Sequence, residues 1–249
     1  MIEIKNIHKT FGENHVLQGI SAEFAEGKCN LIIGGSGSGK TTLLKCMIGL
    51  HEPEEGAVFY NGRDFTRMNF ATRIEIRTEI GMLFQGSALF DSMNVEDNII
   101  FPINMFTNQS HKENLDRANF CLERVNLAGK NKLFPAELSG GMKKRVGIAR
   151  AIAMNPKYLF VDEPNSGLDP KTAIVIDELI QELTTEYNTT TIVVTHDMNS
   201  VMGIGDNIIF LHGGKKWWEG TNKEISSTDN KELNEFVFAS KFMQTLQKK

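Results

Sequence analysis

The chain has few of the features that mark secreted, membrane-spanning or metal-dependent proteins. Its 249 residues include three cysteines, Cys29, Cys46 and Cys121, whose spacing fits neither a metal site nor a disulfide framework. We expect free, buried thiols in a reducing compartment. The first residues lack the pattern of a signal peptide. No apolar run approaches the roughly 20 residues of a membrane span. These absences predict a soluble, cytosolic protein, unless another subunit holds it at a membrane.

A block of basic residues is also missing, and the formal net charge is −4. A protein that binds nucleic acid usually carries a basic stripe or patch to neutralise phosphates. We therefore do not expect nucleic acid as a partner. The apolar content of 41% is that of an ordinary globular protein, and the length suits one large α/β domain or two small domains.

The most informative stretch that is present is rich in glycine. It follows the apolar residues 31–33, which predict a buried strand, and precedes apolar residues at helical spacing in 43–48. Strand, glycine-rich turn and helix is the context in which G-x-x-x-x-G-K-[ST] forms a phosphate-binding loop. The residues expected to bind nucleotide here are Gly34, Gly35, Ser36, Gly37, Ser38, Gly39, Lys40, Thr41 and Thr42.

The chemistry of this loop suits a nucleoside triphosphate with Mg²⁺. Glycines let backbone N–H groups point inward, and the helix that follows adds its positive N-terminal end. Lys40 can supply a full charge to the β- and γ-phosphates, and the Thr41 hydroxyl can coordinate Mg²⁺. The alternative, a flexible Gly/Ser loop, does not explain the flanking strand and helix.

Polar residues end three further predicted strands, where α/β proteins place their ligands. Asp162 and Glu163 follow one apolar run, His196 follows another, and Gln85 follows a third. Asp162 is a candidate Mg²⁺ ligand, and Glu163 could orient or activate a water. His196 could reach the γ-phosphate, and Gln85 could ligate Mg²⁺ or position water. The alternatives are a helix cap for the aspartate and a structural role for the histidine.

A second glycine-rich segment predicts a second anion site. Ser139, Gly140 and Gly141 open a stretch with helical apolar spacing. The N-terminus of such a helix can bind phosphate, although an ordinary capped helix would have the same sequence. The chain therefore has two candidate phosphate-binding helix ends.

Strands that alternate with helices predict an α/β fold with a mainly parallel sheet. Alternating apolar residues in 2–24 and a two-glycine turn at Gly213 and Gly214 add an antiparallel flank. Within 86–155 the strand pattern fades, which predicts an inserted helical subdomain. We expect one domain over about 1–220 and a helical extension over 221–249.

The motifs, in this order, resemble the nucleotide-binding subunit of ATP-binding cassette (ABC) transporters over about residues 1–220. The matching segments are the Walker A loop 34–42, Q-loop Gln85, signature 138–142, Walker B run 158–163, D-loop 166–169 and switch His196. The resemblance implies a P-loop ATPase that works as a homodimer and docks on integral membrane permease subunits.

The resemblance also implies composite ATP sites, each with Walker A from one copy and Ser139, Gly140 and Gly141 from the other. Asp169 would link the two sites. Glu163, His196, Lys40 and Gln85 would form the catalytic set, with Thr41, Gln85 and Asp162 around Mg²⁺. Phe11, followed by Val16, falls where the family stacks an aromatic ring on adenine, and Phe stands here for the usual Tyr.

Some residues depart from the usual ABC motifs, and others point to a subgroup of the ABC family. Met142 stands where Gln is commonest in the signature, and Asn165 replaces the usual Thr before the D-loop. Residues 85–99 are similar to ATPases of Mla-type lipid transport. That similarity implies phospholipid cargo, an MCE-domain lipid-binding partner and a place on the cytoplasmic face of the inner membrane.

Other functions remain open. A different cargo, such as a polar solute, fits the same motifs. A soluble, non-transport ABC protein usually has two cassettes or a long coiled coil, and this chain has neither pattern. A non-catalytic nucleotide sensor would not need both Glu163 and His196.

Two surfaces could receive partners. One set of apolar residues could dock a permease helix or equally form the core of the helical subdomain. Its members are Phe84, Leu89, Phe90, Met93, Phe101, Met105 and Phe106. Of the paired Trp217 and Trp218, we expect one in the core. Residues 229–249 predict an amphipathic helix docked on this or a neighbouring subunit.

Overall fold

The strands separate into two sheets, and the first of these is antiparallel. In the computed structural model, residues 1–238 are described. The smaller sheet has the order β2-β1-β4-β5. Its strands are β1 (Ile2–Phe11), β2 (Asn14–Phe24), β4 (Glu55–Tyr60) and β5 (Arg63–Asp64). The expected antiparallel pairing of the N-terminal segments is therefore present, in a sheet of its own.

The larger sheet is mainly parallel, and its order is β10-β9-β3-β8-β7-β6. Its strands are β3 (Lys28–Ile33), β6 (Ile80–Leu83), β7 (Tyr158–Asp162), β8 (Thr190–Thr195), β9 (Asn207–His212) and β10 (Lys215–Gly220). Only β10 pairs antiparallel, with β9, across the turn at Gly213 and Gly214, which both have positive φ. This arrangement confirms the predicted fold class.

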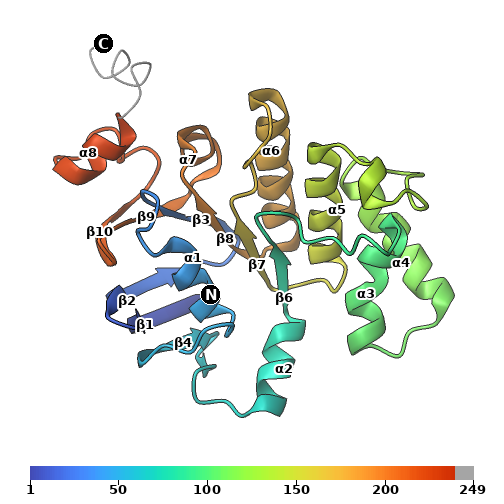
Figure 1. The fold of residues 1–249 in the computed structure, drawn as a ribbon, viewed down its shortest axis with the longest axis horizontal. Coiled ribbons are helices and arrows are strands. Elements are labelled where there is room, and N and C mark those ends of the chain that lie inside the picture. Colours follow the sequence, from blue (N-terminus) through green and yellow to red (C-terminus); the bar gives the residue numbers. More distant parts are fainter. Residues whose placement is uncertain (239–249) are drawn as a thin grey trace.

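Helices cover the larger sheet and fill the predicted insertion. They are α1 (Lys40–Met47), α2 (Phe70–Thr78), α3 (Val95–Phe106), α4 (His111–Arg124), α5 (Gly140–Ile152), α6 (Pro170–Tyr187), α7 (Met198–Ile204) and α8 (Lys231–Val237). Figure 1 places α3 and α4 at one side of the molecule and α8 at the opposite side. Within residues 1–238, no helix is long and apolar enough to cross a membrane.

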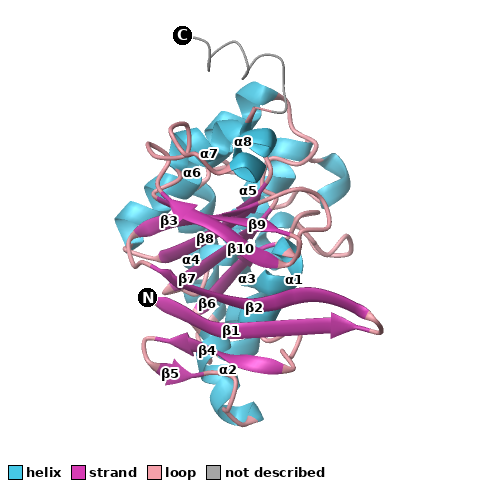
Figure 2. Cartoon of the chain, turned by 90° about the vertical axis from the view of Figure 1, so that its left-hand side faces the viewer, coloured by secondary structure: helices cyan, strands magenta, loops and turns pink. Residues whose placement is uncertain are grey.

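Alternating side chains of the parallel strands build two separate cores. Tyr158 and Phe160 of β7 face the core shared with α1, α2 and the antiparallel sheet, whereas Leu159 and Val161 face the core shared with α3 to α8. Figure 2 shows the resulting layers, with the antiparallel sheet below and most helices above the parallel sheet. Because both faces of β7 are buried, the strand is a continuous apolar run, as the sequence predicts.

The C-terminal extension is joined to the helical core as far as it is described. Leu233 and Val237 of α8 are buried in that core, and Phe236 stacks on Phe210 with ring centroids 5.4 Å apart. Trp217 is exposed and Trp218 packs partly buried on the core, as expected. The rest of the predicted amphipathic helix, residues 239–249, lies outside the described part of the chain.

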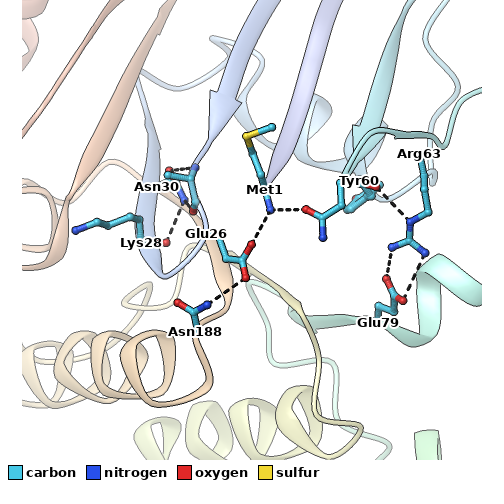
Figure 3. A network of polar contacts seen from close by, with 10 residues as sticks. Met1, Glu26, Lys28, Asn30, Tyr60, Arg63, Glu79 and Asn188 are labelled. Carbon is cyan, nitrogen blue, oxygen red and sulfur yellow. Dashed lines mark hydrogen bonds and ion pairs between the residues drawn. The ribbon is translucent and has the colours of Figure 1, made fainter.

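A polar network ties the two sheets together at the end where the parallel strands begin (Figure 3). Arg63 Nε donates to the Tyr60 carbonyl at 3.3 Å, and its Nη2 pairs with Glu79, just before β6, at 2.5 Å. Asn188 Nδ2 donates to Glu26 Oε1 at 3.1 Å, which joins the end of α6 to the loop before β3. These contacts leave the opposite, carboxyl edge of the sheet open.

Gly81 allows β6 to pass close to the last turn of α5. A Cβ at this position would lie 2.3 Å from the Ala151 carbonyl oxygen. We expect Gly81→Ala to lower the free energy of unfolding by about 1–3 kcal/mol. Gly203→Ala in α7 is the matched control, because its Cβ would meet no atom of the described residues within 4 Å. That variant should gain about 0.5–1 kcal/mol. Urea unfolding measures both, and equal effects would contradict the close approach.

Candidate active site

The glycine-rich loop joins β3 to α1, as predicted, and needs glycine for two reasons. Gly39, at the start of α1, has φ of 101°, and Gly37 has φ of 75°. A Cβ on Gly39 would lie 2.7 Å from Leu17 Cδ2 and 3.0 Å from the Val16 carbonyl oxygen. Backbone strain and close approach to β2 therefore both exclude larger residues there. Val16, a predicted site residue, lies beside this turn.

Lys40 lies within the curve of the loop. Its Nζ donates to the carbonyls of Gly34 and Gly35, each at 2.9 Å. Burial lowers the pKa of Lys40, while the negative charges of Glu163 and Asp162 raise it. The Ser38 hydroxyl is buried and has no hydrogen-bond partner among residues 1–238. A phosphate in this loop would give both side chains a suitable partner.

A cleft of about 960 Å³ opens beside the loop at the carboxyl edge of the sheet. Among its lining residues are Gly35, Ser36, Gly37, Lys40, Thr41, Gln85, Glu163 and His196. These residues come from the segments after β3, β6, β7 and β8, as the sequence pattern predicts. The size suits a nucleotide-sized ligand.

The two carboxylates after β7 point to different partners. Asp162 Oδ1 accepts from Thr41 Oγ1 at 3.4 Å. Glu163 carries its side chain toward His196, whose Nδ1 lies 2.8 Å from Oε2. Burial and the charge of Glu163 raise the pKa of Asp162, and the hydrogen bond from Thr41 and the cations Lys45 and Lys144 lower it. The two acids are therefore adjacent in sequence but available for different tasks.

The donors near Thr41 fit Mg²⁺. The ion prefers oxygen ligands and usually keeps several waters, so it needs only one or two protein ligands beside the phosphates. The Thr41 hydroxyl and the Asp162 carboxylate already lie within 3.4 Å of each other. Gln85 lines the same cleft with an exposed carboxamide.

Several predicted nucleotide-binding residues lie away from this cleft. Ser139 caps α5 by accepting from Met142 N at 3.3 Å, and Asp169 caps α6 by accepting from Thr172 N at 3.1 Å. A Cβ on Gly141 would lie 2.7 Å from Thr172 Cγ2, so the two helix starts pack together. Ser139 therefore has the capping role that the sequence left open, whereas no cap was predicted at Asp169.

Phe11 also stands outside the cleft lining. It is 45% exposed at the end of β1, in edge contact with His51 at 5.3 Å. Gly140 has only the Leu168 side chain near its would-be Cβ, at 3.5 Å. Within one chain, neither residue meets the phosphate loop in the cleft.

A buried polar network behind the cleft was not foreseen. Asn165 Nδ2 donates to both carboxylate oxygens of Asp177 at 3.0 Å and to Ser200 Oγ at 2.9 Å. The network joins the loop after Glu163 to α6 and α7. The departure from the family pattern at residue 165 was its only signal in the sequence. Asp177 is the one charged residue among the buried residues of α6, and its position in the sequence does not reveal its partner.

Comparison with known proteins identifies the class. A family model described as ABC transporter matches residues 17–166. The MlaF protein of Haemophilus influenzae, an intermembrane phospholipid transport system ATP-binding protein, is 38% identical over 95% of this chain and 90% of its own. The methionine import ATP-binding protein MetN of Campylobacter jejuni is 37% identical over 98% of this chain and 77% of its own.

A third relative carries a different cargo name. The probable ribonucleotide transport ATP-binding protein mkl of Mycobacterium leprae is 35% identical over 95% of this chain and 68% of its own. The chain thus spans about two thirds of that relative.

A solved structure agrees with the family. The dimeric, post-hydrolysis ATP-binding cassette MJ0796, bound to ADP and Pi, superposes with a TM-score of 0.82 at 33% identity. The match covers 89% of this chain and 99% of that one. The chain belongs to the ABC transporter family. It is an ATP-binding subunit of that family and an ATPase.

The network at Asp177 predicts a pH-dependent stability. Burial raises the pKa of the Asp177 carboxyl from 3.8 to about 6, and nearby Asp197 adds to the effect. Between these pH values the unfolded chain has lost this proton and the folded chain still holds it, so the contribution of Asp177 to stability falls as pH rises.

We expect Asp177→Asn to remove this contribution. Relative to the variant, the wild type should lose about 2 kcal/mol of unfolding free energy between about pH 4.5 and 7.5. Urea unfolding at several pH values measures the difference. Glu178→Gln, which changes an exposed neighbour on α6, should keep the wild-type pH dependence. Parallel curves for wild type and Asp177→Asn would contradict the burial argument.

Proposed function

We propose that this chain hydrolyses ATP with Mg²⁺ to drive phospholipid transport through a membrane permease. The proposed ATPase site rests on one observation: Lys40, Thr41, Glu163 and His196 line the same cleft. Support for the lipid cargo is narrower. It comes from MlaF among the relatives and from the resemblance of residues 85–99 to Mla-type ATPases.

Each residue has a proposed role that follows from its position. Lys40 and the loop N–H groups hold the β- and γ-phosphates. Glu163 orients and polarises the attacking water, and His196, 2.8 Å from that carboxylate, contacts the γ-phosphate. Gln85 lies on the same wall to position water. Mg²⁺, when held by Thr41 with Gln85 and Asp162 near it, would neutralise charge on the phosphates.

The working unit in this proposal is a homodimer. The start of α5 and Asp169 lie away from the chain's own cleft, so they are available to a second copy. Ser139, Gly140 and Gly141 of one copy would close on the ATP held by the other. Because ATP would complete the interface, binding would favour the closed dimer and hydrolysis would release it. The dimeric cassettes among the structural neighbours support this arrangement.

The proposed permease surface lies on the helical subdomain. None of the seven apolar candidates there is fully buried, although a core role was the alternative. Phe84 is 38% exposed, Phe90 40%, Met105 60% and Phe106 45%. Leu89, Met93 and Phe101 are half-buried. Exposed Met and Phe side chains suit an apolar helix of a partner. Docking there would place the chain on the cytoplasmic face of the inner membrane, with an MCE-domain protein as a further partner.

A different cargo is the second candidate. Relatives named for methionine and ribonucleotide transport are as similar to this chain as MlaF. In this candidate the ATPase chemistry stays the same, and only the permease and its cargo change.

Glu163→Gln tests the proposed catalytic role. The amide keeps the shape of the side chain but cannot polarise water as a carboxylate does. We expect ATP binding to persist, hydrolysis to slow at least about 100-fold, and a closed dimer to accumulate with ATP. Phosphate release and size-exclusion chromatography measure these effects.

Two further variants frame that test. Glu182→Gln, at an exposed position of α6, should match the wild type. Lys40→Ala should weaken ATP binding itself, because it removes the positive charge that would contact the phosphates. Unchanged turnover in Glu163→Gln would show that another group activates the water.

Purification from native membranes tests the partners and the cargo. In mild detergent, we expect the tagged chain to bring down a permease, an MCE-domain protein and phospholipid, identified by mass spectrometry. Phe106→Ser should lose the permease because it removes an exposed apolar contact, and Phe120→Ser, 39% exposed on α4, should keep it. Recovery of a permease of another type would rule out the proposed lipid cargo. Absence of any membrane protein would overturn the proposed role in transport.

A further inference from the structure

The backbone around the proposed catalytic groups is strained. Glu163 has φ of 48°, and Ser87 and Ala88, just after Gln85, have φ of 63° and 46°. Non-glycine residues in this left-handed region are strained, so they persist only where neighbouring groups hold them. One hold on Glu163 comes from the sheet, where its N–H donates to the Val194 carbonyl at 2.9 Å.

Two cationic side chains of α5 donate the other hydrogen bonds to these strained residues. Lys144 Nζ donates to the Glu163 carbonyl at 3.1 Å and also to the Gln85 carbonyl. Arg150, further along the same helix, donates to the carbonyls of Ser87 at 2.7 Å and Ala88 at 2.8 Å. The carbonyls of Glu163, Ser87 and Ala88 therefore each accept a hydrogen bond from a charged side chain of α5, the helix that Ser139 caps.

The helix also approaches this segment very closely. A Cβ on Gly147, between the two cations, would lie 2.6 Å from Leu83 Cδ1 at the end of β6. The close packing of α5 on β6 fixes the distance between the Lys144 backbone and the carbonyls of Glu163 and Gln85. The position of the ammonium is therefore set by the core and not by a mobile surface side chain.

The charge of Lys144 is itself expensive to bury. The residue is 4% exposed, and burial lowers its pKa, while Asp162 and Glu163 oppose that effect. A buried cation is retained only where it is paired and hydrogen-bonded. Lys144 is hydrogen-bonded to the main-chain carbonyls of the proposed water-activating residue and of the Q-loop glutamine, and the negative charges of Asp162 and Glu163 favour its charged form.

We infer that Lys144 is a positioning residue for ATP hydrolysis, which acts by fixing the main chain of Glu163 and Gln85 from the signature helix. This inference rests on the proposed role of Glu163. It assigns no direct contact with ATP to Lys144. Loss of Lys144 should therefore reduce turnover and leave ATP affinity nearly unchanged.

Replacement variants separate this role from simple packing. Lys144→Met keeps the length and removes the donors, whereas Lys144→Gln keeps two N–H donors without the charge. We expect Lys144→Met to lower kcat about 10-fold or more with ATP affinity within about 2-fold, since hydrogen bonds from charged groups are worth roughly 1.5–3 kcal/mol. Lys144→Gln should recover part of the loss. Lys112→Met, at an exposed lysine of α4, is the matched control and should match the wild type.

A double-mutant cycle tests whether Lys144 acts through Glu163. In the Glu163→Gln background, Lys144→Met should add little further loss in single-turnover hydrolysis, because the group that it positions is already disabled. A full, multiplied loss in that background would overturn the inference. Wild-type kcat in Lys144→Met would overturn it as well.

The remaining outcomes are also decisive. If Lys144→Met is unfolded by circular dichroism, Lys144→Gln takes its place in the same cycle. Loss of folding in both variants would overturn the inference, because Lys144 would then determine the fold. If Glu163→Gln alone kept full turnover, the proposed role of Glu163 would fail, which is a different result from normal activity in the Lys144 variants.

Discussion

The site depends on placing opposite charges together at one edge of a buried sheet. The side chains of Lys40, Lys144 and Asp162 are buried there, and Glu163 is half-buried. Each of these charges would be costly to bury alone. Together they offset that cost, since burial and the neighbouring charges shift the pKa values of both lysines in opposing directions. A cleft that already balances its charges can hold a polyanionic phosphate and Mg²⁺ without large rearrangement of the protein.

The same edge is held in place by contacts that lie elsewhere. The two cores fix β7 on both faces, and the Arg63–Glu79 pair ties the antiparallel sheet to the segment before β6. Against this rigid support, Glu163 can sit at φ of 48° with its side chain on His196. Strain at a functional residue is tolerated when the surroundings determine the backbone. Here the Glu163 N–H donates to the Val194 carbonyl of β8, and Lys144 of α5 donates to the Glu163 carbonyl.

Much of the fold and of the candidate site could be predicted from the sequence, because local sequence patterns encode them. The phosphate loop is contiguous, and strands β7 and β8 are apolar runs that end in the functional residues. Lys144, Arg150 and Asn165 could not be predicted in the same way. Their partners lie 12 to 63 residues away, and their roles arise only when α5 and α6 pack against the loops after β6 and β7. The separation of the antiparallel strands into their own sheet is likewise a result of packing.

The position of α5 has a consequence for the proposed dimer. Its first residues carry the glycine-rich segment, which lies away from the chain's own cleft, and its fifth residue, Lys144, bonds the carbonyls of Glu163 and Gln85. A rigid helix transmits a shift at its start to its next turn. Closure of Ser139, Gly140 and Gly141 on the partner's ATP would then alter the position of Glu163 in the same chain. In this arrangement the nucleotide in one cleft could influence the water-activating group of the other without a long chain of intermediates.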